Sequence, residues 1–173
     1  MLDIVTYGNE ILAQKAEPVK EFTPELAAFV EELYDTMVKG HGVGLAANQV
    51  GKLLRIFVTG VDGDKQRVFI NPEIIATSPE EADYEEGCLS LPEITGEVLR
   101  PPRAVITATN LKGERFTMAG AGLLARCWQH EHDHLEGVLI LSRMNQMSRL
   151  RNRAAVRDLE RRAGPRRYRD VRA

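Results

Sequence analysis

The most regular apolar pattern in the first part of the chain follows Thr23-Pro24-Glu25. A hydroxyl residue, a proline and an acid in that order are typical of a helix start. Apolar residues then recur three or four positions apart, as they do on one face of a helix, at Leu26, Val30, Leu33 and Met37. Gly40 is typical of a helix end. The pattern therefore predicts an amphipathic helix between Thr23 and Gly40.

Four short runs rich in apolar and β-branched residues predict β-strands, at residues 53–59, 67–70, 104–109 and 115–118. The first two runs are separated by Asp62-Gly63-Asp64, and the last two by Leu111-Lys112-Gly113. Both separating segments are typical of turns. We therefore expect two hairpins of antiparallel strands.

Two further helices are predicted in the C-terminal half. One runs from Ala121 to about Gly137, with packing positions at Leu123, Leu124, Cys127 and Leu135. The other covers about 145–163 and ends at Gly164-Pro165; its apolar positions are few, so we expect it on the surface. Short strands with helices at either end predict an α+β fold with antiparallel sheets around the 121–137 helix, not a βαβ alternation.

Size and composition indicate an ordinary globular protein. The chain has 173 residues, of which 43% are hydrophobic and 28% charged, so one domain is the default expectation. It contains neither a signal-type segment nor a run of 18 apolar residues. We therefore expect a cytoplasmic protein with no membrane partner.

The net charge of −2 conceals an uneven distribution. From Arg149 onward there are ten arginines and three acidic residues, a balance of +7, which leaves −9 for the residues before them. An acidic body with a basic tail is informative about partners and not about the fold.

The residues with the most specific chemistry lie in the predicted 121–137 helix, where residues 130–134 read His-Glu-His-Asp-His. His130 and His134 are four positions apart, about 40° around a helix axis, so they can bind one metal ion. Glu131 lies about 100° from His130, close enough to reach a metal-bound water without being a ligand. His132 lies about 200° round and is expected to point away. The pattern is typical of a metal hydrolase.

A catalytic metal normally takes a third protein ligand, and the chain has two cysteines that could supply it. Cys127 lies on the same helix face, but it is seven positions from His134, about 10.5 Å along the axis. That distance argues against shared ligation and favours a small apolar role beside the site. Cys88, in a segment bounded by glycine and proline, is either a ligand from a separate element or a buried, inert thiol.

The segment Gly42–Gly51 contains a GxGxxA pattern like that of dinucleotide-binding proteins. That fingerprint must follow a strand and open a helix, whereas here it follows a helix and leads to a strand, so we reject this interpretation. The segment is either a tight turn of small residues or a backbone edge that an extended substrate can approach, with Gln49 as a polar group.

Three segments together, GVGLAANQVG, EGCLS and QHEHDHLEG, resemble the three signature motifs of the peptide deformylase family. Their order and spacing match, and the resemblance covers most of residues 1 to about 145. It implies that Cys88, His130 and His134 are the metal ligands. Its extent predicts a single catalytic domain over residues 1–145, and the arginine-rich sequence that follows predicts a basic helix and tail over residues 146–173.

The resemblance also assigns the remaining catalytic and substrate-binding groups. Glu131 would be the general base and acid for attack by a metal-bound hydroxide. Gln49 and the backbone N–H of Leu89 would stabilise the oxyanion, and Gly44 would bond the substrate backbone. Val43, Leu123 and Cys127 are our candidates for a methionine pocket, because they are apolar and adjoin the motif residues.

The expected reaction is removal of the formyl group from the N-terminal formyl-methionine of newly made polypeptides. The resemblance implies Fe²⁺ as the ion, with Zn²⁺ or Ni²⁺ able to substitute, and a thiolate with two imidazoles disfavours Mg²⁺ and Ca²⁺. The expected partners are N-formylmethionyl nascent peptides and, through the arginine-rich tail, the ribosome, whose surface is mostly RNA. We expect no DNA partner.

A few positions depart from the family pattern or leave a role open. Arg126 stands where an apolar residue often lines the methionine pocket, and Glu93 and Thr95 lie in a variable stretch. These residues affect which substrate side chain is preferred and do not affect the hydrolytic reaction. Asp133, three positions after His130, is either a partner for the free ring nitrogen of His130 or a solvent-facing acid.

Two other classes of protein share parts of this pattern. A general HExxH protease usually takes its third ligand, histidine or glutamate, from downstream of the motif, whereas the candidate here is an upstream cysteine. A structural zinc module would need four closed ligands and no base beside them.

Overall fold

The structure is a computed structural model that describes residues 1–164. Its helices are α1 (Pro24–Lys39), α2 (Gly122–Leu135), α3 (Ile140–Arg143), α4 (Gln146–Arg151) and α5 (Arg153–Ala163), with short 3₁₀ helices at Glu10–Ala13 and Ala47–Val50. Its strands are β1 (Gly44–Ala46), β2 (Ile56–Thr59), β3 (Arg67–Thr77), β4 (Ala82–Cys88), β5 (Leu91–Arg100), β6 (Arg103–Thr109) and β7 (Arg115–Ala121). The predicted α+β fold with antiparallel sheets is confirmed.

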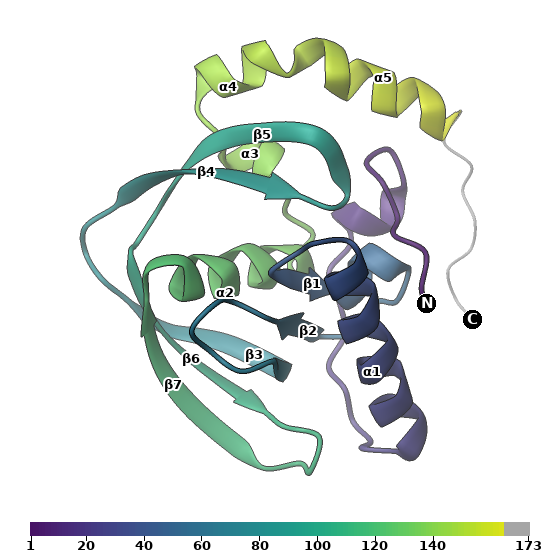
Figure 1. Cartoon of the computed structure of the whole chain (residues 1–173), viewed down its shortest axis with the longest axis vertical. Coiled ribbons are helices and arrows are strands. Elements are labelled where there is room, and N and C mark those ends of the chain that lie inside the picture. The colour runs from purple at the N-terminus through teal and green to yellow at the C-terminus, as the bar shows by residue number, and fades with distance from the viewer. Residues whose placement is uncertain (165–173) are drawn as a thin grey trace.

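Helix α2 lies between two sheets, as Figure 1 shows. On one side is a five-stranded sheet in the order β1-β2-β3-β6-β7, and on the other is the β4–β5 hairpin. The buried indole of Trp128 packs α2 against the larger sheet, with its ring 6.0 Å from that of Phe69. Both faces of α2 are therefore covered by strands, and its motif residues are held away from solvent.

Helix α1 begins and ends where the sequence predicts. The hydroxyl of Thr23 accepts a hydrogen bond from the Leu26 N–H at 3.1 Å, and Gly40 follows the last helical residue. The apolar face of α1 packs on β1 and β2.

The β4–β5 hairpin is longer than expected from the sequence, which indicated only a short strand or turn near Cys88. Acidic residues are depleted in strands, and β4 carries three of them. The buried face of β5 includes Gly96 and Arg100 beside its apolar residues, which obscures the alternation. Strand β3 likewise extends to Thr77, beyond the predicted residues 67–70.

The single C-terminal helix expected over about 145–163 is two helices, α4 and α5, with Asn152 between them. The Asn152 amide donates to the Ser148 carbonyl at 2.8 Å and to the Thr95 carbonyl of β5 at 2.7 Å. A side chain that bonds to nearby backbone in this way competes with a continuous helix.

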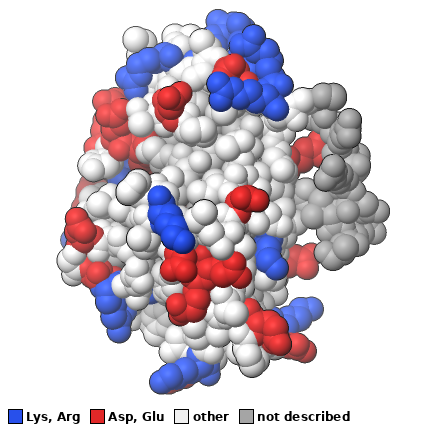
Figure 2. All heavy atoms as spheres, turned by 45° about the vertical axis from the view of Figure 1, so that its right-hand side comes forward, with Lys and Arg blue, Asp and Glu red and all other residues white. Residues whose placement is uncertain are grey.

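The C-terminal helices lie on the surface of the β4–β5 hairpin, as the shortage of apolar positions predicts. Leu159 is the only residue of α5 that is buried. All arginines from 149 to 162 are exposed, and Figure 2 shows basic side chains gathered at this end of the molecule. Among residues 1–164, no helix has both the length and the apolar character needed to cross a bilayer.

Candidate metal centre and active site

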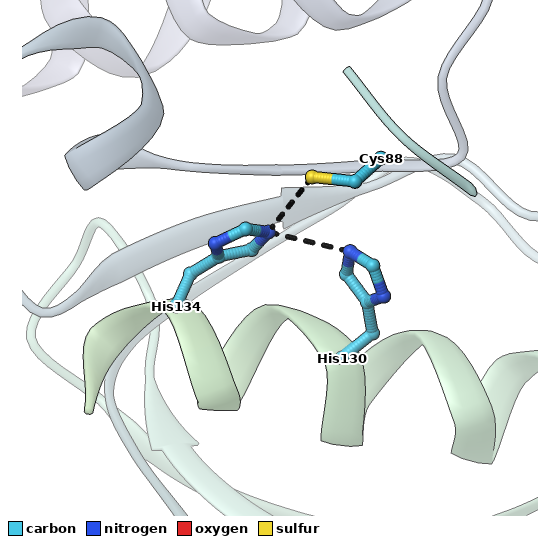
Figure 3. Close-up of side chains that lie close together, drawn as sticks. All are labelled: Cys88, His130 and His134. Atoms are coloured by element: carbon cyan, nitrogen blue, oxygen red, sulfur yellow. Dashed lines mark hydrogen bonds between the residues drawn. The ribbon is translucent and has the colours of Figure 1, made fainter. Parts of the chain in front are cut away.

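Cys88, His130 and His134 meet between β4 and α2 (Figure 3). Cys88 is the last residue of β4, and the two histidines lie one turn apart on α2. His134 Nε2 lies 3.5 Å from Cys88 Sγ and 3.3 Å from His130 Nε2. The three donor atoms all lie within 4.8 Å of one another, close enough to converge on one ion.

The chemistry of this cluster fits a transition metal. Burial alone would lower the pKa of His130, but contacts with Cys88 and Glu86 outweigh it and raise that pKa to about 10. A metal ion displaces protons from the atoms that bind it, so a proton held between these donor atoms occupies the place that a bound cation would take. Within residues 1–164 the cluster contains three ligands, whereas a structural zinc site closes with four. The arrangement therefore suits a catalytic ion with an open position.

Cys127 lies outside the cluster. Its thiol is buried and lies 3.5 Å from the Val43 carbonyl oxygen. Burial, with the nearby carboxylate of Glu131, raises the pKa of this thiol well above its usual value. Because the thiolate is the form that binds metals, Cys127 is unsuited to ligation. His132 is also outside the cluster, as its helix position predicts.

Glu86, and not Asp133, orients His130. The His130 Nδ1 atom lies 2.8 Å from Glu86 Oε1, so the alternative in which Asp133 pairs with this ring nitrogen is wrong. The carboxylate of Asp133 instead accepts hydrogen bonds from Arg100 at 2.9 Å and from Arg143 at 2.8 Å. Because Asp133 is also buried, the alternative of a solvent-facing acid is wrong too.

Glu86 also accepts hydrogen bonds from two buried guanidinium groups. It accepts from Arg100 Nε at 2.7 Å and from Arg126 Nη1 at 2.6 Å. Burial would raise the pKa of Glu86, but the hydrogen bonds from His130 and Arg100 outweigh it and hold the pKa at about 2. Glu86 lies two residues before Cys88, which places both side chains on one face of β4. This spacing is the sequence signal that could have identified Glu86 as a residue of the site.

Glu131 is buried beside the cluster with a free carboxylate oxygen. It is 4% exposed, and within residues 1–164 its Oε2 atom has no hydrogen-bond partner. Burial raises its pKa to about 7, which suits a group that takes and returns a proton near neutral pH.

Gly44, the first residue of β1, provides the room for Glu131. A Cβ atom at Gly44 would lie 2.6 Å from Glu131 Oε1 and 2.8 Å from Cys127 Sγ. Only glycine avoids that overlap. Strand β1 is also an edge strand that pairs with β2, so its other edge can receive an extended chain.

Gln49 and Leu89 both lie beside Cys88. The side-chain oxygen Oε1 of Gln49 accepts a hydrogen bond from the Ala46 N–H at 3.0 Å, which fixes the orientation of the side-chain amide. Its Nε2 atom lies 3.5 Å from Cys88 Sγ and 3.2 Å from Ser90 Oγ. Leu89 follows Cys88 directly in the turn between β4 and β5.

A cavity of about 550 Å³ opens onto these residues. Its lining includes Gly44, Gln49, Cys88, Leu89, His130 and Glu131. The three candidate pocket residues also line it, with Val43 and Leu123 about two-fifths exposed and Cys127 buried. Arg126 lines the cavity as well, but its charge is engaged by Glu86, and its guanidinium lies 5.3 Å from the Tyr84 ring.

Comparison with known proteins identifies relatives over most of the chain. A sequence model described as polypeptide deformylase matches residues 1–150. A peptide deformylase from Desulfitobacterium hafniense is 47% identical over 146 residues, which cover 84% of this chain and 96% of that protein. One from Treponema pallidum is 43% identical over 159 residues, with coverage of 90% and 98%. The crystal structure of peptide deformylase from Thermotoga maritima superposes with a TM-score of 0.82 at 43% identity, covering 84% of this chain and 98% of that one.

Proposed function

The chain belongs to the polypeptide deformylase family, and from that premise we propose that it hydrolyses the formyl group from the N-terminal formyl-methionine of newly made polypeptides. The products are formate and a free α-amine. The observation that carries the proposal is the convergence of Cys88, His130 and His134 beside Glu131, whose buried carboxylate oxygen is unpartnered within residues 1–164. A substrate of this kind would place the enzyme in the cytoplasm.

In this proposal Cys88, His130 and His134 hold one divalent ion, with Fe²⁺ as the ion in cells and Zn²⁺ or Ni²⁺ as substitutes. A thiolate with two imidazoles suits these ions and disfavours Mg²⁺ and Ca²⁺. When bound, the ion supplies a Lewis acid that lowers the pKa of a coordinated water towards about 7. Glu86 keeps His130 in the orientation that directs Nε2 towards the other two ligands.

Glu131 moves the proton. Its free Oε2 takes a proton from the attacking water and later gives it to the amine as the carbon–nitrogen bond breaks. The Gln49 amide and the Leu89 N–H donate to the formyl oxygen as it becomes negative. The loss of one such donor typically lowers the rate by about 10²–10³-fold. We assign this chemistry to residues 1–145.

The peptide would lie along the free edge of β1, where the Gly44 backbone can bond to it as an added strand. Its methionine side chain would enter the part of the cavity lined by Val43, Leu123 and Cys127. A pocket with these apolar side chains has no partner for a charged one, which would lose its hydration there.

Formyl-Met peptides are therefore expected to exceed formyl-Asp and formyl-Lys peptides in kcat/KM by well over tenfold. The measurement is formate release from peptides that differ only in the first residue, with an acetyl-Met peptide as the control for the acyl group. Equal rates for all three formyl peptides would exclude the pocket. Absence of formate from the formyl-Met peptide would contradict the proposed function itself.

We also propose that the arginine-rich C-terminal segment, residues 146–173, docks on ribosomal RNA. In its described part all six arginines are exposed, and Arg153 and Arg157 have no ion-pair partner within residues 1–164. Arg166, Arg167, Arg169 and Arg172 lie outside the described residues. Phosphate contacts of this kind weaken steeply as the salt concentration rises.

Replacing Arg149, Arg153 and Arg157 together by glutamine is expected to weaken cosedimentation with ribosomes at low salt at least several-fold. These substitutions are preferable to truncation after Gln146, which would remove the buried Leu159. Turnover of a formyl-Met tripeptide should stay at the wild-type value. Ribosome binding that survives the substitutions, or that does not depend on salt, would contradict the docking role.

A further inference from the structure

A second cavity, of about 670 Å³, lies away from the metal centre. It is bordered by α1, by the connection between β2 and β3, and by the turn between β6 and β7. In Figure 1 that turn lies at the end of the molecule opposite α4 and α5. Within residues 1–164 the lining of this cavity shares no residue with that of the active-site cavity. A ligand bound here would therefore leave the active site free.

The lining of this second cavity is basic. Its charged members are Lys65, Arg67 and Lys112, and the part of the chain that the structure describes contributes no aspartate or glutamate to it. Lys65 and Lys112 are exposed, and neither forms an ion pair with another of residues 1–164. Two ammonium groups on separate loops can thus approach one anion.

Acids lie near this lining as well, but they leave the two lysines unpaired. Arg67 donates to Asp64 through Nε and Nη2, each at 2.8 Å, so this pair is close to neutral. Glu31 lies one turn before Tyr34 on α1, and Glu114 accepts a hydrogen bond within the β6–β7 turn at 3.4 Å. Neither of these acids lines the cavity. An anion in the cavity would therefore meet the lysine ammonium groups first.

The same cavity has an apolar wall with aromatic rings. Phe116 of β7 packs on Phe69 with ring centroids 5.6 Å apart and is still partly exposed. Tyr34 is also partly buried, and its hydroxyl forms no hydrogen bond within residues 1–164. Burial raises the pKa of that hydroxyl, so it stays protonated and can donate to a ligand. The wall is completed by three partly buried side chains, Val68, Leu111 and Met118.

Together these features match a ligand that combines an anionic group with a flat apolar body. Lysine ammonium groups are common phosphate ligands. Nucleobases stack on aromatic side chains, because every base has a π-face. A cavity of about 670 Å³ is within the range that holds one small molecule.

We propose that this second cavity is a binding site for a free nucleoside monophosphate or diphosphate. The phosphates would lie between Lys65 and Lys112, and the base would lie against Phe116 and Tyr34. The Tyr34 hydroxyl would donate to the base or the ribose. The proposal does not depend on deformylation, because none of these residues lines the active-site cavity.

The test is a titration of the zinc-loaded full-length protein with ADP, followed through the NMR signals of its backbone amides at about 0.05 M salt, where screening is weak. We expect a Kd below about 1 mM. The shifts should be concentrated at residues 65–68, 110–112 and 116–118. Adenosine, which has no phosphate, and pyrophosphate, which has no base, should each bind about tenfold more weakly. At about 0.5 M salt ADP should also bind more weakly, because exposed charges are then screened.

Replacing Lys65 and Lys112 together by glutamine should weaken ADP binding about five- to tenfold. Both lysines are exposed, so the fold should be unaffected, and formate release from a formyl-Met peptide should stay at the wild-type value. The matched control is Lys20→Gln/Lys39→Gln, which removes two exposed lysines outside the lining and should keep the wild-type Kd for ADP.

Absence of ADP binding, or shifts confined to the surroundings of Cys88 and His130, would overturn this inference. Affinity for ADP that is unchanged in the Lys65/Lys112 double variant, or pyrophosphate binding as strong as that of ADP, would also overturn it. A tetra-adenylate that binds much more tightly than ADP would overturn the free nucleotide as the ligand and indicate single-stranded RNA instead.

Discussion

Glutamine in place of Glu131 is expected to lower deformylation by about 10²–10⁴-fold while metal affinity stays near the wild-type value. The substitution keeps the shape that fits against Gly44, where a Cβ would lie only 2.6 Å from the carboxylate. It removes the ability to take and return a proton. The carboxylate is not one of the three clustered donors, so the metal site should remain complete.

The measurement pairs formate release from a formyl-Met peptide with elemental analysis of the same protein sample. His130→Ala is the control, because it removes a proposed ligand from the same helix and should lose both metal and turnover. If Glu131→Gln lost metal to the extent that His130→Ala does, its role would be ligation and not proton transfer.

The second large effect is expected on replacing Cys88, with Cys127 as the matched control. Cys88→Ala should reduce turnover to the background level, and added metal should not restore it, because Cys88 Sγ is one of three donors within 4.8 Å. Cys127→Ala should retain most of the turnover. Its thiol contacts the Val43 carbonyl, and its raised pKa keeps it protonated. Formate release from a formyl-Met peptide at saturating metal measures both.

Local sequence patterns predict those helices and strands in which caps, turn residues and the spacing of apolar residues all agree with the structure formed. Helix α1 follows from a cap, a proline and a regular apolar face, and each of these features is present in the structure. The β6–β7 hairpin follows from two short runs and a glycine turn. The fold class could therefore be predicted from the sequence, because antiparallel neighbours are joined by turns that the sequence displays.

The β4–β5 hairpin and the break at Asn152 depend on contacts that are distant in sequence. The buried acid of β4, Glu86, is tolerated because it meets Arg100 and Arg126, which lie 14 and 40 positions away, whereas Asp83 and Glu85 are exposed. Asn152 interrupts the C-terminal helix because it reaches Thr95 of β5. Neither partner can be identified from local pattern alone.

In the metal site, too, some features follow from local sequence and others from contacts that are distant in sequence. The spacing of His130 and His134 predicts their proximity directly, whereas residue-level reasoning left Cys88 as either a ligand or an inert thiol until the family resemblance was considered. Neither alternative for Asp133 is correct, because tertiary contacts decide its position. Its position on the helix allowed an interaction with His130, but Arg100 and Arg143 engage it instead.

Metal content of the protein purified without oxygen tests the central claim most directly, since loss of an oxidisable ion is then avoided. Wild-type protein and Cys127→Ala should each contain about one transition-metal ion per chain, and Cys88→Ala should contain almost none. Retention of metal by Cys88→Ala together with its loss from Cys127→Ala would contradict the assignment of Cys88, His130 and His134 as the metal site.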